Sequence, residues 1–367
     1  MRPLKLCFVN LSALTFTVAT PDHAPLGGSE SSLCYLARQL ARRGHNIALA
    51  ANLPEGAAAI IENIRHFPLA TIKDAGFFAA EKFDAIIICN APAAAAPFKA
   101  MAPGARIIFW AHVLPDQPSM QVLKDETTRA SIDATVFVSA WQRGEVERVF
   151  GPLLGAHVIG NGIAPAFENM FASADDLVHA KRNRAIYAAT PYRGLSVLLR
   201  AMEGFDRPTG LDLFSSMRVY QSSDEDYAPL FRQAERIPAV TSHGAVTQTE
   251  LARHMREAAF LFYPSIYAET FCIMAAEALA AGLKVVATEL GALSDTTMGF
   301  ADLVPVTSSD GDVLVTSFRE AMRRAVDDFA QDPVIWAERR FAQAQQASRI
   351  FAWAGRAAEW EIMLGFA

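Results

Sequence analysis

The chain has 367 residues, a length typical of two domains rather than one. Hydrophobic residues make up 52% of it and charged residues 20%, a balance that excludes a disordered chain. The formal net charge is −6: residues 1–162 carry 14 basic and 13 acidic side chains, and residues 163–367 carry 19 and 26. Neither half has the basic excess that neutralises nucleic-acid phosphates, so we expect no nucleic-acid partner.

The cysteines and the N-terminal residues indicate the cellular compartment of the protein. The four cysteines lie far apart, with no CxxC pair and no histidine cluster at metal-ligand spacing, so we expect buried thiols and no metal: Cys7, Cys34, Cys89 and Cys272. The first twenty residues have the outline of a signal peptide, but Asn10, Ser12 and Thr15 interrupt the apolar run, and a first core strand is the preferred interpretation. No stretch reaches the ~18 apolar residues of a membrane span, and we expect a cytoplasmic protein.

Apolar runs of strand length alternate with helical patterns along the whole chain. The predicted strands are Leu4–Val9, Ile47–Ala50, Ala85–Cys89, Arg106–Trp110, Thr135–Val138, Ala185–Ala189, Leu211–Ser215, Ala259–Tyr263 and Lys284–Ala287. The amphipathic segment Ser31–Arg43 is typical of the helices expected between them. The alternation predicts two Rossmann-like, doubly wound α/β domains, with about six strands before residue 162 and about four or five after residue 184.

The segment Ile159–Asp176 is the predicted linker, because it holds Asn161-Gly162 and Pro165 and has little periodicity. We therefore expect an N-terminal domain at residues 1–163, a C-terminal domain at 164–347 and a helical, aromatic tail at 348–367. Two such domains facing one another form a cleft. In open α/β sheets ligands bind beyond the carboxyl ends of the strands, so chemistry is expected just after strands.

The strongest motif, residues 268–282, follows a predicted strand and carries Glu269 and Glu277. A helix beginning near Phe271 would leave Glu269 in the preceding loop and Glu277 in the second turn. The free N–H groups and positive dipole end between them suit a diphosphate, and carboxylates accept hydrogen bonds from sugar hydroxyls. The structural alternative is that Glu277 lies in a buried network and that Glu269 only complements the helix dipole.

Three further motifs also follow predicted strands. The pair Gly27-Gly28 would let the backbone approach a ligand, with Ser29 as the helix cap, or would form a plain turn. Arg193 is suited to neutralise a phosphate, although an isolated arginine is more often exposed to solvent. His112 would hydrogen-bond a polar ligand or transfer a proton, or would be a satisfied structural histidine.

In this order and spacing, the motifs resemble the family 4 retaining glycosyltransferases of the GT-B fold. The matching pieces are Gly27-Gly28-Ser29-Glu30, the strand ending in His112, Asn161-Gly162-Ile163, Arg193-Gly194, His243-Gly244, Tyr263-Pro264-Ser265 and the segment from Glu269 to Glu277. The resemblance covers most of the chain.

The resemblance implies a metal-independent transferase without a cofactor. Its second domain would bind a nucleotide-diphosphate sugar, and its first domain a glycan, lipid-linked or small-molecule acceptor. Glu269 would hold hydroxyls of the donor sugar, Glu277 the nucleotide ribose and Arg193 the diphosphate, with His112 beside the transferred sugar. The other residues implied in nucleotide-sugar binding are Gly27, Gly28, Thr270, Phe271, Cys272 and Gly244. The tail would be similar to the family's last helix, which returns to the first domain.

The sequence departs from the family pattern at two informative places. The family's second basic residue, a few positions before Arg193, is absent from the run Tyr187-Ala188-Ala189-Thr190. Cys272 stands where the family usually has glycine. Phosphate neutralisation is therefore expected to rest more heavily on Arg193 and the helix N-terminus.

The resemblance favours transfer with retained anomeric configuration, by same-face attack through an oxocarbenium-like state. Two other classes stay open: a nucleotide-sugar epimerase or hydrolase on the same architecture, and a non-enzymatic two-lobed binding protein. Assaying the donor without an acceptor separates the first class. The group Arg38, Arg42 and Arg43 is a candidate for peripheral contact with anionic lipid, or is simply a solvated helix face.

Overall fold

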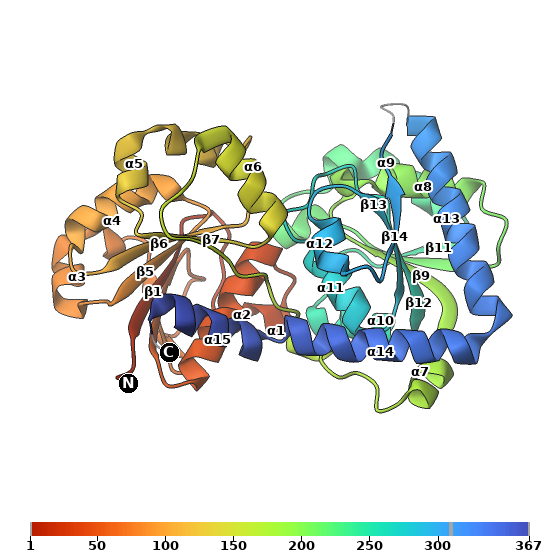
Figure 1. The fold of residues 1–367 in the computed structure, drawn as a ribbon, viewed down its shortest axis with the longest axis horizontal. Coiled ribbons are helices and arrows are strands. Elements are labelled where there is room, and N and C mark those ends of the chain that lie inside the picture. Colours follow the sequence, from red (N-terminus) through yellow and green to blue (C-terminus); the bar gives the residue numbers. More distant parts are fainter. Residues whose placement is uncertain (1, 308–310, 366–367) are drawn as a thin grey trace. The chain divides into compact units, whose positions relative to one another are not determined.

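The computed structural model describes residues 2–307 and 311–365 (Figure 1). Contacts divide the chain into unit 1, which runs up to Gly162 and resumes at Trp353, and unit 2, Ile163–Ala352. The sequence places these boundaries at 163/164 and 347/348. The second division falls at Ala352 because this residue separates the last two helices and adopts an extended conformation.

Unit 1 is built on an eight-stranded sheet in the order β3-β4-β2-β1-β5-β6-β7-β8. The strands are β1 Lys5–Asn10, β2 Asn46–Ala51, β3 Ile60–Ile61, β4 Ile64–Pro68, β5 Ala85–Cys89, β6 Arg106–Ala111, β7 Ala134–Phe137 and β8 Ala156–Val158. All neighbours pair in parallel except β3 and β4. The chain order reverses direction between β1 and β5, which is the topological switch point of this sheet.

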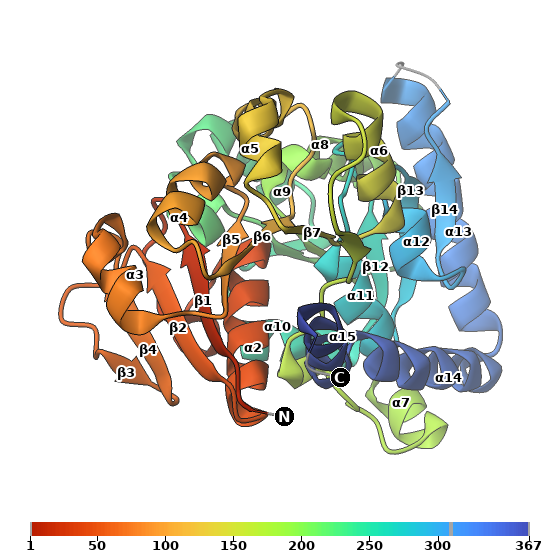
Figure 2. The same ribbon diagram turned by 60° about the vertical axis from the view of Figure 1, so that its left-hand side comes forward.

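Helices cover both faces of the unit 1 sheet, as its continuous apolar strands require. The helices are α1 Thr20–His23, α2 Gly28–Arg42, α3 Ala75–Glu81, α4 Ala95–Met101, α5 Glu126–Ala130, α6 Ala140–Phe150 and α15 Trp353–Leu364. On one face, Phe78 and Phe98 of α3 and α4 pack on strand side chains such as Ile88. On the other, α15 lies beside α2, and Trp360 packs edge-on against Trp110 at a centroid distance of 5.0 Å (Figure 1 and Figure 2).

A buried carboxylate fastens α15 to unit 1. Glu361 accepts hydrogen bonds from Arg43 Nε at 2.8 Å and from His45 Nε2 at 3.0 Å. His45 Nδ1 accepts the Leu4 N–H at 3.1 Å, so the His45 proton lies on Nε2. The Arg43 hydrogen bond is the main reason that the pKa of Glu361 is lowered.

Unit 2 is built on a six-stranded parallel sheet in the order β11-β10-β9-β12-β13-β14. The strands are β9 Arg182–Ala188, β10 Gly210–Phe214, β11 Val240–Ser242, β12 Ala258–Tyr263, β13 Lys284–Glu289 and β14 Asp302–Pro305. This is the 3-2-1-4-5-6 order of dinucleotide-binding sheets, with its switch point between β9 and β12.

The helices of unit 2 form two layers (Figure 1). They are α7 Ala174–Ala180, α8 Leu195–Glu203, α9 Ala228–Glu235, α10 Gln248–Glu257, α11 Ile273–Ala280, α12 Leu293–Thr297, α13 Gly311–Gln331 and α14 Pro333–Phe351. Helix α13 packs on α8, whereas α14 packs on α11 and α7. Within the ranges that the structure describes, no helix combines the length and the apolar character needed to cross a membrane.

All nine predicted strands are present, with ends that differ by at most three residues, but the two strand counts were wrong. Unit 1 has eight strands rather than about six, and the described part of unit 2 has six. The missed strands are β3, β4, β8, β11 and β14. Each is short and lies at or next to a sheet edge, where β4 places Arg65 and His66 and β11 places Thr241 and Ser242. Edge strands need no continuous apolar run, so the sequence carries little signal for them.

Glu361→Gln is expected to destabilise unit 1 by about 1–3 kcal/mol, because it removes a buried charge that two side chains solvate. The loss should shrink as the pH falls through the lowered pKa of Glu361, where the native carboxylate itself becomes protonated. Urea unfolding at pH 7 and at low pH measures both effects. Glu359→Gln on the exposed side of α15 is the matched control, expected within about 0.5 kcal/mol of the wild type. Equal losses in the two variants would contradict the role of Glu361.

Candidate functional site

The switch point of unit 2 brings two predicted residues together. Arg193 ends the 3₁₀ turn that follows β9, and Glu269 lies in the loop that follows β12. Because β9 and β12 are neighbours in a parallel sheet, the loops after them leave the same edge. Arg193 Nη1 forms an ion pair with Glu269 Oε1. Two residues far apart in the sequence therefore form one charged pair where ligands bind in sheets of this order.

Tyr263 completes this pair. Its phenolic hydroxyl donates to the same Glu269 Oε1 at 2.5 Å. Burial raises the pKa of Tyr263 well above its usual range, so the phenol keeps its proton as a donor. Burial also disfavours the charge of Arg193, but the neighbouring groups, with Glu269 first among them, together outweigh burial and raise the pKa of Arg193. Glu269 is only 5% exposed, so the pair lies in a largely desolvated place.

Tyrosines surround the pair, and sequence reasoning missed them. Five of the seven tyrosines of the chain gather here: Tyr187, Tyr192, Tyr220, Tyr263 and Tyr267. The Arg193 guanidinium lies 4.5 Å from the ring centroid of Tyr267 and 5.6 Å from that of Tyr192. Burial raises the pKa of Tyr220, and Arg193 and Tyr192 both act on that pKa, so Tyr220 also lies close to the pair. Tyr192 and Tyr267 flank the motifs in sequence and could have been suspected, whereas nothing near Tyr220 marks it.

Glycines fix the backbone on either side of the pair. Glu269 forms an isolated bridge with Gly291, and its carbonyl accepts the Ala292 N–H at 2.7 Å. Gly291 has φ +66°, and a Cβ there would lie 2.4 Å from the Glu269 backbone. A Cβ on Gly194, at φ +112°, would lie 2.0 Å from the Pro264 carbonyl oxygen. Neither position tolerates a side chain, and together they set the two loops in register.

The helix after Glu269 begins later than predicted. It was expected near Phe271, but α11 is Ile273–Ala280, with Cys272 as its N-cap. Cys272 has φ +66°, a left-handed conformation that suits glycine, and this interrupts the helix at that point. The first amides bonded within this turn are those of Ala275 and Ala276, which reach the Cys272 carbonyl. The N-terminal amides of the helix are thus those of Ile273 and Met274 rather than those of Phe271 and Cys272.

The other predicted residues of this loop are mostly enclosed. Phe271 is 6% exposed, with its ring edge-on to Phe351 at 5.8 Å and its carbonyl bound by the Thr296 hydroxyl. Cys272 is 7% exposed, and burial raises the pKa of its thiol well above the usual range. Thr270 lies between Glu269 and Phe271 in the same loop. Any contact of Phe271 or Cys272 with a ligand would therefore be through the backbone.

Glu277 lies in the second turn of α11 and is 1% exposed. Its Oε1 accepts the Ala164 N–H at 3.2 Å, whereas Oε2 has no hydrogen-bond partner among residues 2–307 and 311–365. Burial raises the pKa of Glu277 to about 8. A buried carboxylate with an unused oxygen is costly unless a ligand completes its hydrogen bonds. The alternative that Glu277 belongs to a buried hydrogen-bond network therefore applies to Oε1 but not to Oε2.

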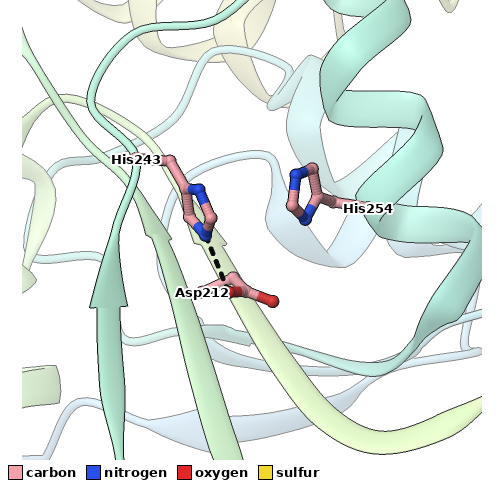
Figure 3. Close-up of side chains that lie close together, drawn as sticks. All are labelled: Asp212, His243 and His254. Carbon is pink, nitrogen blue, oxygen red and sulfur yellow. Dashed lines mark hydrogen bonds and ion pairs between the residues drawn. The ribbon is translucent and has the colours of Figure 1, made fainter.

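Gly244 follows β11 and has φ +70°. Beside it, Asp212, His243 and His254 bring their potential ligand atoms within 4.8 Å of one another (Figure 3). His243 Nε2 hydrogen-bonds Asp212 Oδ1 at 2.8 Å. Arg184, however, binds both Asp212 oxygens. A divalent cation here would compete with a guanidinium for the one carboxylate, so the group fits an ion-pair network better than a metal centre.

Unit 1 carries the remaining predicted residues. Helix α2 begins at Gly28, and its N-cap is Gly27 rather than the expected Ser29. Gly27 has no side chain that could cap this helix. Gly27 is buried and Gly28 is exposed. Close approach of the backbone at Gly28 to a ligand stays a prediction.

His112 follows β6 and is 8% exposed. Its Nε2 lies 3.2 Å from Asn161 Oδ1, and its Nδ1 lies 3.7 Å from Cys89 Sγ. Burial lowers the pKa of His112 to about 4, against the opposing effect of the Asn161 hydrogen bond. An imidazole with that pKa is uncharged at neutral pH and is poorly matched to general acid-base work. The proton-transfer role considered for His112 is not favoured.

Family models match both halves of the chain. The model of the group 1 glycosyl transferases matches residues 185–329, and that of glycosyltransferase family 4 matches residues 26–167. A comparison with curated protein sequences finds no significant match.

Solved structures resemble the whole chain. HepE from Anabaena, in complex with UDP and glucose, has a TM-score of 0.73 at 16% identity over 99% of this chain and 100% of its own. Sucrose-phosphate synthase from Thermosynechococcus elongatus has 0.70 at 16% over 98% of each chain. The catalytic domain of starch synthase IV from Arabidopsis thaliana, bound to ADP and acarbose, has 0.66 at 14% over 99% of each. With two parallel-sheet domains of the GT-B fold and both family models matched, the chain belongs to the glycosyltransferases of group 1 and family 4.

Proposed function

We propose that the chain transfers a sugar from a nucleotide-diphosphate sugar to an acceptor hydroxyl, with retained configuration and without a metal. The Arg193–Glu269 pair at the unit 2 switch point is the observation that carries the proposal. Structures similar to this chain contain UDP, UDP-glucose or ADP, which supports a nucleotide-linked donor and leaves its base open. The acceptor is a glycan, a lipid-linked molecule or a small molecule.

Arg193 receives the diphosphate in this proposal. Its guanidinium is shielded by tyrosine rings, and in such a place a charge interaction is stronger than in water. As the glycosidic bond breaks, negative charge grows on the departing β-phosphate oxygen. Arg193 and the first amides of α11, at Ile273 and Met274, are fixed groups that stabilise this charge. The diphosphate replaces Glu269 as the ion-pair partner of Arg193.

Glu269 then accepts hydrogen bonds from the donor sugar. Its carboxylate is released by Arg193 but remains held by the Tyr263 hydroxyl, so it does not have to be repositioned. Glu277 accepts the ribose hydroxyls on its free Oε2, the buried oxygen that has no partner in the structure. Two carboxylates thus bind the two sugars on either side of the diphosphate, as the sequence pattern predicts.

The transfer proceeds on one face of the donor sugar. The bond from the anomeric carbon to the phosphate oxygen breaks with both electrons staying on the phosphate, and an oxocarbenium-like centre forms. The acceptor oxygen attacks that centre from the same side, and its proton passes to the departing phosphate. By the family resemblance, Gly28 would receive the diphosphate and His112 would lie beside the transferred sugar. Arg193 and the dipole of α11 supply the positive charge that a metal would otherwise provide.

A donor panel tests the function directly. UDP- and ADP-linked sugars are incubated with mono- and disaccharide acceptors in the presence of EDTA, and NMR reports the anomeric configuration of the product. We expect transfer with retention, undiminished by EDTA. Glu269→Ala should lose at least about a hundredfold in kcat, because a hydrogen bond made to the reacting sugar is removed. Glu235→Ala, exposed at the end of α9, is the matched control.

Three results would argue against the proposal. Donor consumption that needs no acceptor would identify an epimerase or hydrolase. Loss of activity in EDTA with rescue by manganese would show that a metal supplies the positive charge that stabilises the departing phosphate. Near-normal turnover by Glu269→Ala would remove the proposed sugar site.

Arg193→Ala should weaken the binding of UDP or ADP by about 1.5–3 kcal/mol, the value of a charge-assisted hydrogen bond. Isothermal titration calorimetry of the nucleotides measures the change. Arg232→Ala on the exposed side of α9 controls for the loss of one positive charge. Unchanged affinity in Arg193→Ala would exclude its contact with the diphosphate.

Nucleotide binding should release a proton near pH 7. Glu277, with its pKa raised to about 8 by burial, is mostly protonated there, and ribose hydroxyls that donate to it would favour the carboxylate. Affinity should therefore rise between pH 6 and about pH 8.5. Calorimetry in buffers of different ionisation enthalpy measures the number of protons released on nucleotide binding. Glu277→Gln should abolish the release and Glu338→Gln, exposed on α14, should not. Binding without proton exchange in the wild type would rule out this role of Glu277.

A further inference from the structure

The C-terminal end of α11 carries an inference about two residues that the proposed function does not use. We propose that Lys181 and Gln343 are positioning residues, which fix this end of α11 and thereby place Glu277 in the donor site. The proposal rests on the proposed function for the ligand that Glu277 binds. It rests on the geometry of unit 2 for the position of the helix.

Lys181 bonds the ends of two helices. It lies between α7 and β9, and its Nζ donates to the carbonyl oxygens of Met255 at 2.8 Å and Ala281 at 2.6 Å. Met255 lies in the last turn of α10, and Ala281 is the first residue after α11. The last carbonyls of a helix have no partner within it, so a side chain that donates to them fixes the helix end. Lys181 therefore joins α10 to α11.

Gln343 of α14 bonds the same end of α11. Its side-chain amide donates to the carbonyl oxygens of Leu279 at 3.1 Å and Leu283 at 2.9 Å. Leu279 lies in the last turn of α11, and Leu283 leads into β13. The amide oxygen accepts from Arg340 Nη1 at 2.6 Å, so partners of opposite kinds set the orientation of the amide. Gln343 thus joins α14 both to α11 and to the strand that follows it.

Both side chains are buried. Gln343 is 0% exposed and Lys181 is 4% exposed, with the Phe171 ring centroid 5.2 Å from the lysine Nζ. Burial, with a smaller effect of the charge of Arg256, lowers the pKa of Lys181 well below its usual range. An ammonium and a neutral amine each have at least two N–H groups, so Lys181 can bond both carbonyls in either protonation state. Enclosed polar groups are costly unless their hydrogen bonds are made, and here the bonds are made to α11.

A short path leads from these bonds to Glu277. The Ala281 N–H donates to the Glu277 carbonyl oxygen at 2.8 Å, so the residue that Lys181 bonds is itself bonded to Glu277. Gly282 follows with φ +69°, and a Cβ there would lie 2.7 Å from Leu177 Cδ1, so α7 packs closely against the turn after α11. With eight residues, α11 is about 12 Å long. In so short a helix, a shift of the C-terminal end also moves Glu277 and the first amides.

The placement of the Glu277 carboxylate comes mostly from its helix. Its Oε1 accepts the Ala164 N–H at 3.2 Å, and Oε2 is the oxygen proposed for the ribose. Hydrogen bonds weaken steeply when their distance or angle departs from the optimum. A fixed end of α11 therefore acts on nucleotide binding through the backbone, although neither Lys181 nor Gln343 contacts the ligand in this proposal.

The variants Lys181→Met and Gln343→Met test the proposal, because they remove the donors and keep the side chains long. Isothermal titration calorimetry with UDP and ADP measures binding at temperatures where each variant is folded. We expect the Kd to rise about fivefold to tenfold, the value of one hydrogen bond. The increase of affinity between pH 6 and about pH 8.5 should move to lower pH, because a displaced α11 admits water to Glu277 and lowers its raised pKa.

Hydrogen exchange reports on the helix without any ligand. Peptides covering residues 273–283 should exchange at least about tenfold faster in both variants, whereas those of α8 should change much less. Lys284→Met is the matched control for the lysine, since Lys284 Nζ donates to Asp302 at 2.6 Å rather than to α11. Gln346→Met changes an exposed glutamine of α14. Neither control should alter the Kd or the exchange of α11.

If Lys181→Met does not fold, Gln343→Met decides the question. Unchanged exchange of α11 in a folded variant would overturn the proposal. So would faster exchange with an unchanged Kd and pH profile, since that result indicates a role in stability alone. Failure of the proposed function would look different: the wild type would bind neither UDP nor ADP, while hydrogen exchange would still show whether Lys181 and Gln343 fix α11.

Discussion

One carboxylate oxygen organises the candidate donor site. Glu269 Oε1 receives both the Arg193 guanidinium and the Tyr263 hydroxyl at the switch point of the unit 2 sheet. An unpartnered arginine in this enclosed place would be costly, so the ligand-free protein needs the pair. A diphosphate can replace the carboxylate as partner of Arg193, and sugar hydroxyls can then replace Arg193 as partners of the carboxylate. The buried charges remain satisfied in both states.

The charge state of each group follows from its surroundings. Arg193 is positive where the leaving group of the proposed reaction becomes negative, and Glu269 raises its pKa against the effect of burial. His112 is uncharged at neutral pH because burial lowers its pKa, against the opposing effect of the Asn161 hydrogen bond. The two residues belong to different units.

The sequence predicts the parts of this structure that depend on periodicity and strand order. Nine strands are visible as apolar runs, and Arg193 and Glu269 are found because ligands bind beyond strand ends. Details that depend on tertiary contacts are missed. Helix α11 begins late because Cys272 adopts a left-handed conformation that its residue type does not suggest. Tyr220 reaches Arg193 from the segment after β10, and no local pattern marks that long-range contact.

The tyrosines around Arg193 compensate for the absence of the family's second basic residue. Where the family has a further cation, this chain has Tyr187-Ala188-Ala189-Thr190, and Arg193 is its one arginine or lysine in that stretch. The rings of Tyr192 and Tyr267 lie against the guanidinium, and Arg193 acts on the pKa of the nearby Tyr220. They exclude water, and a single charge acts more strongly in a less polar medium than in a solvated one. Rigid aromatic surroundings thus offer a physical substitute for a second positive charge. The cost is that Arg193 needs an anionic partner both with and without a ligand.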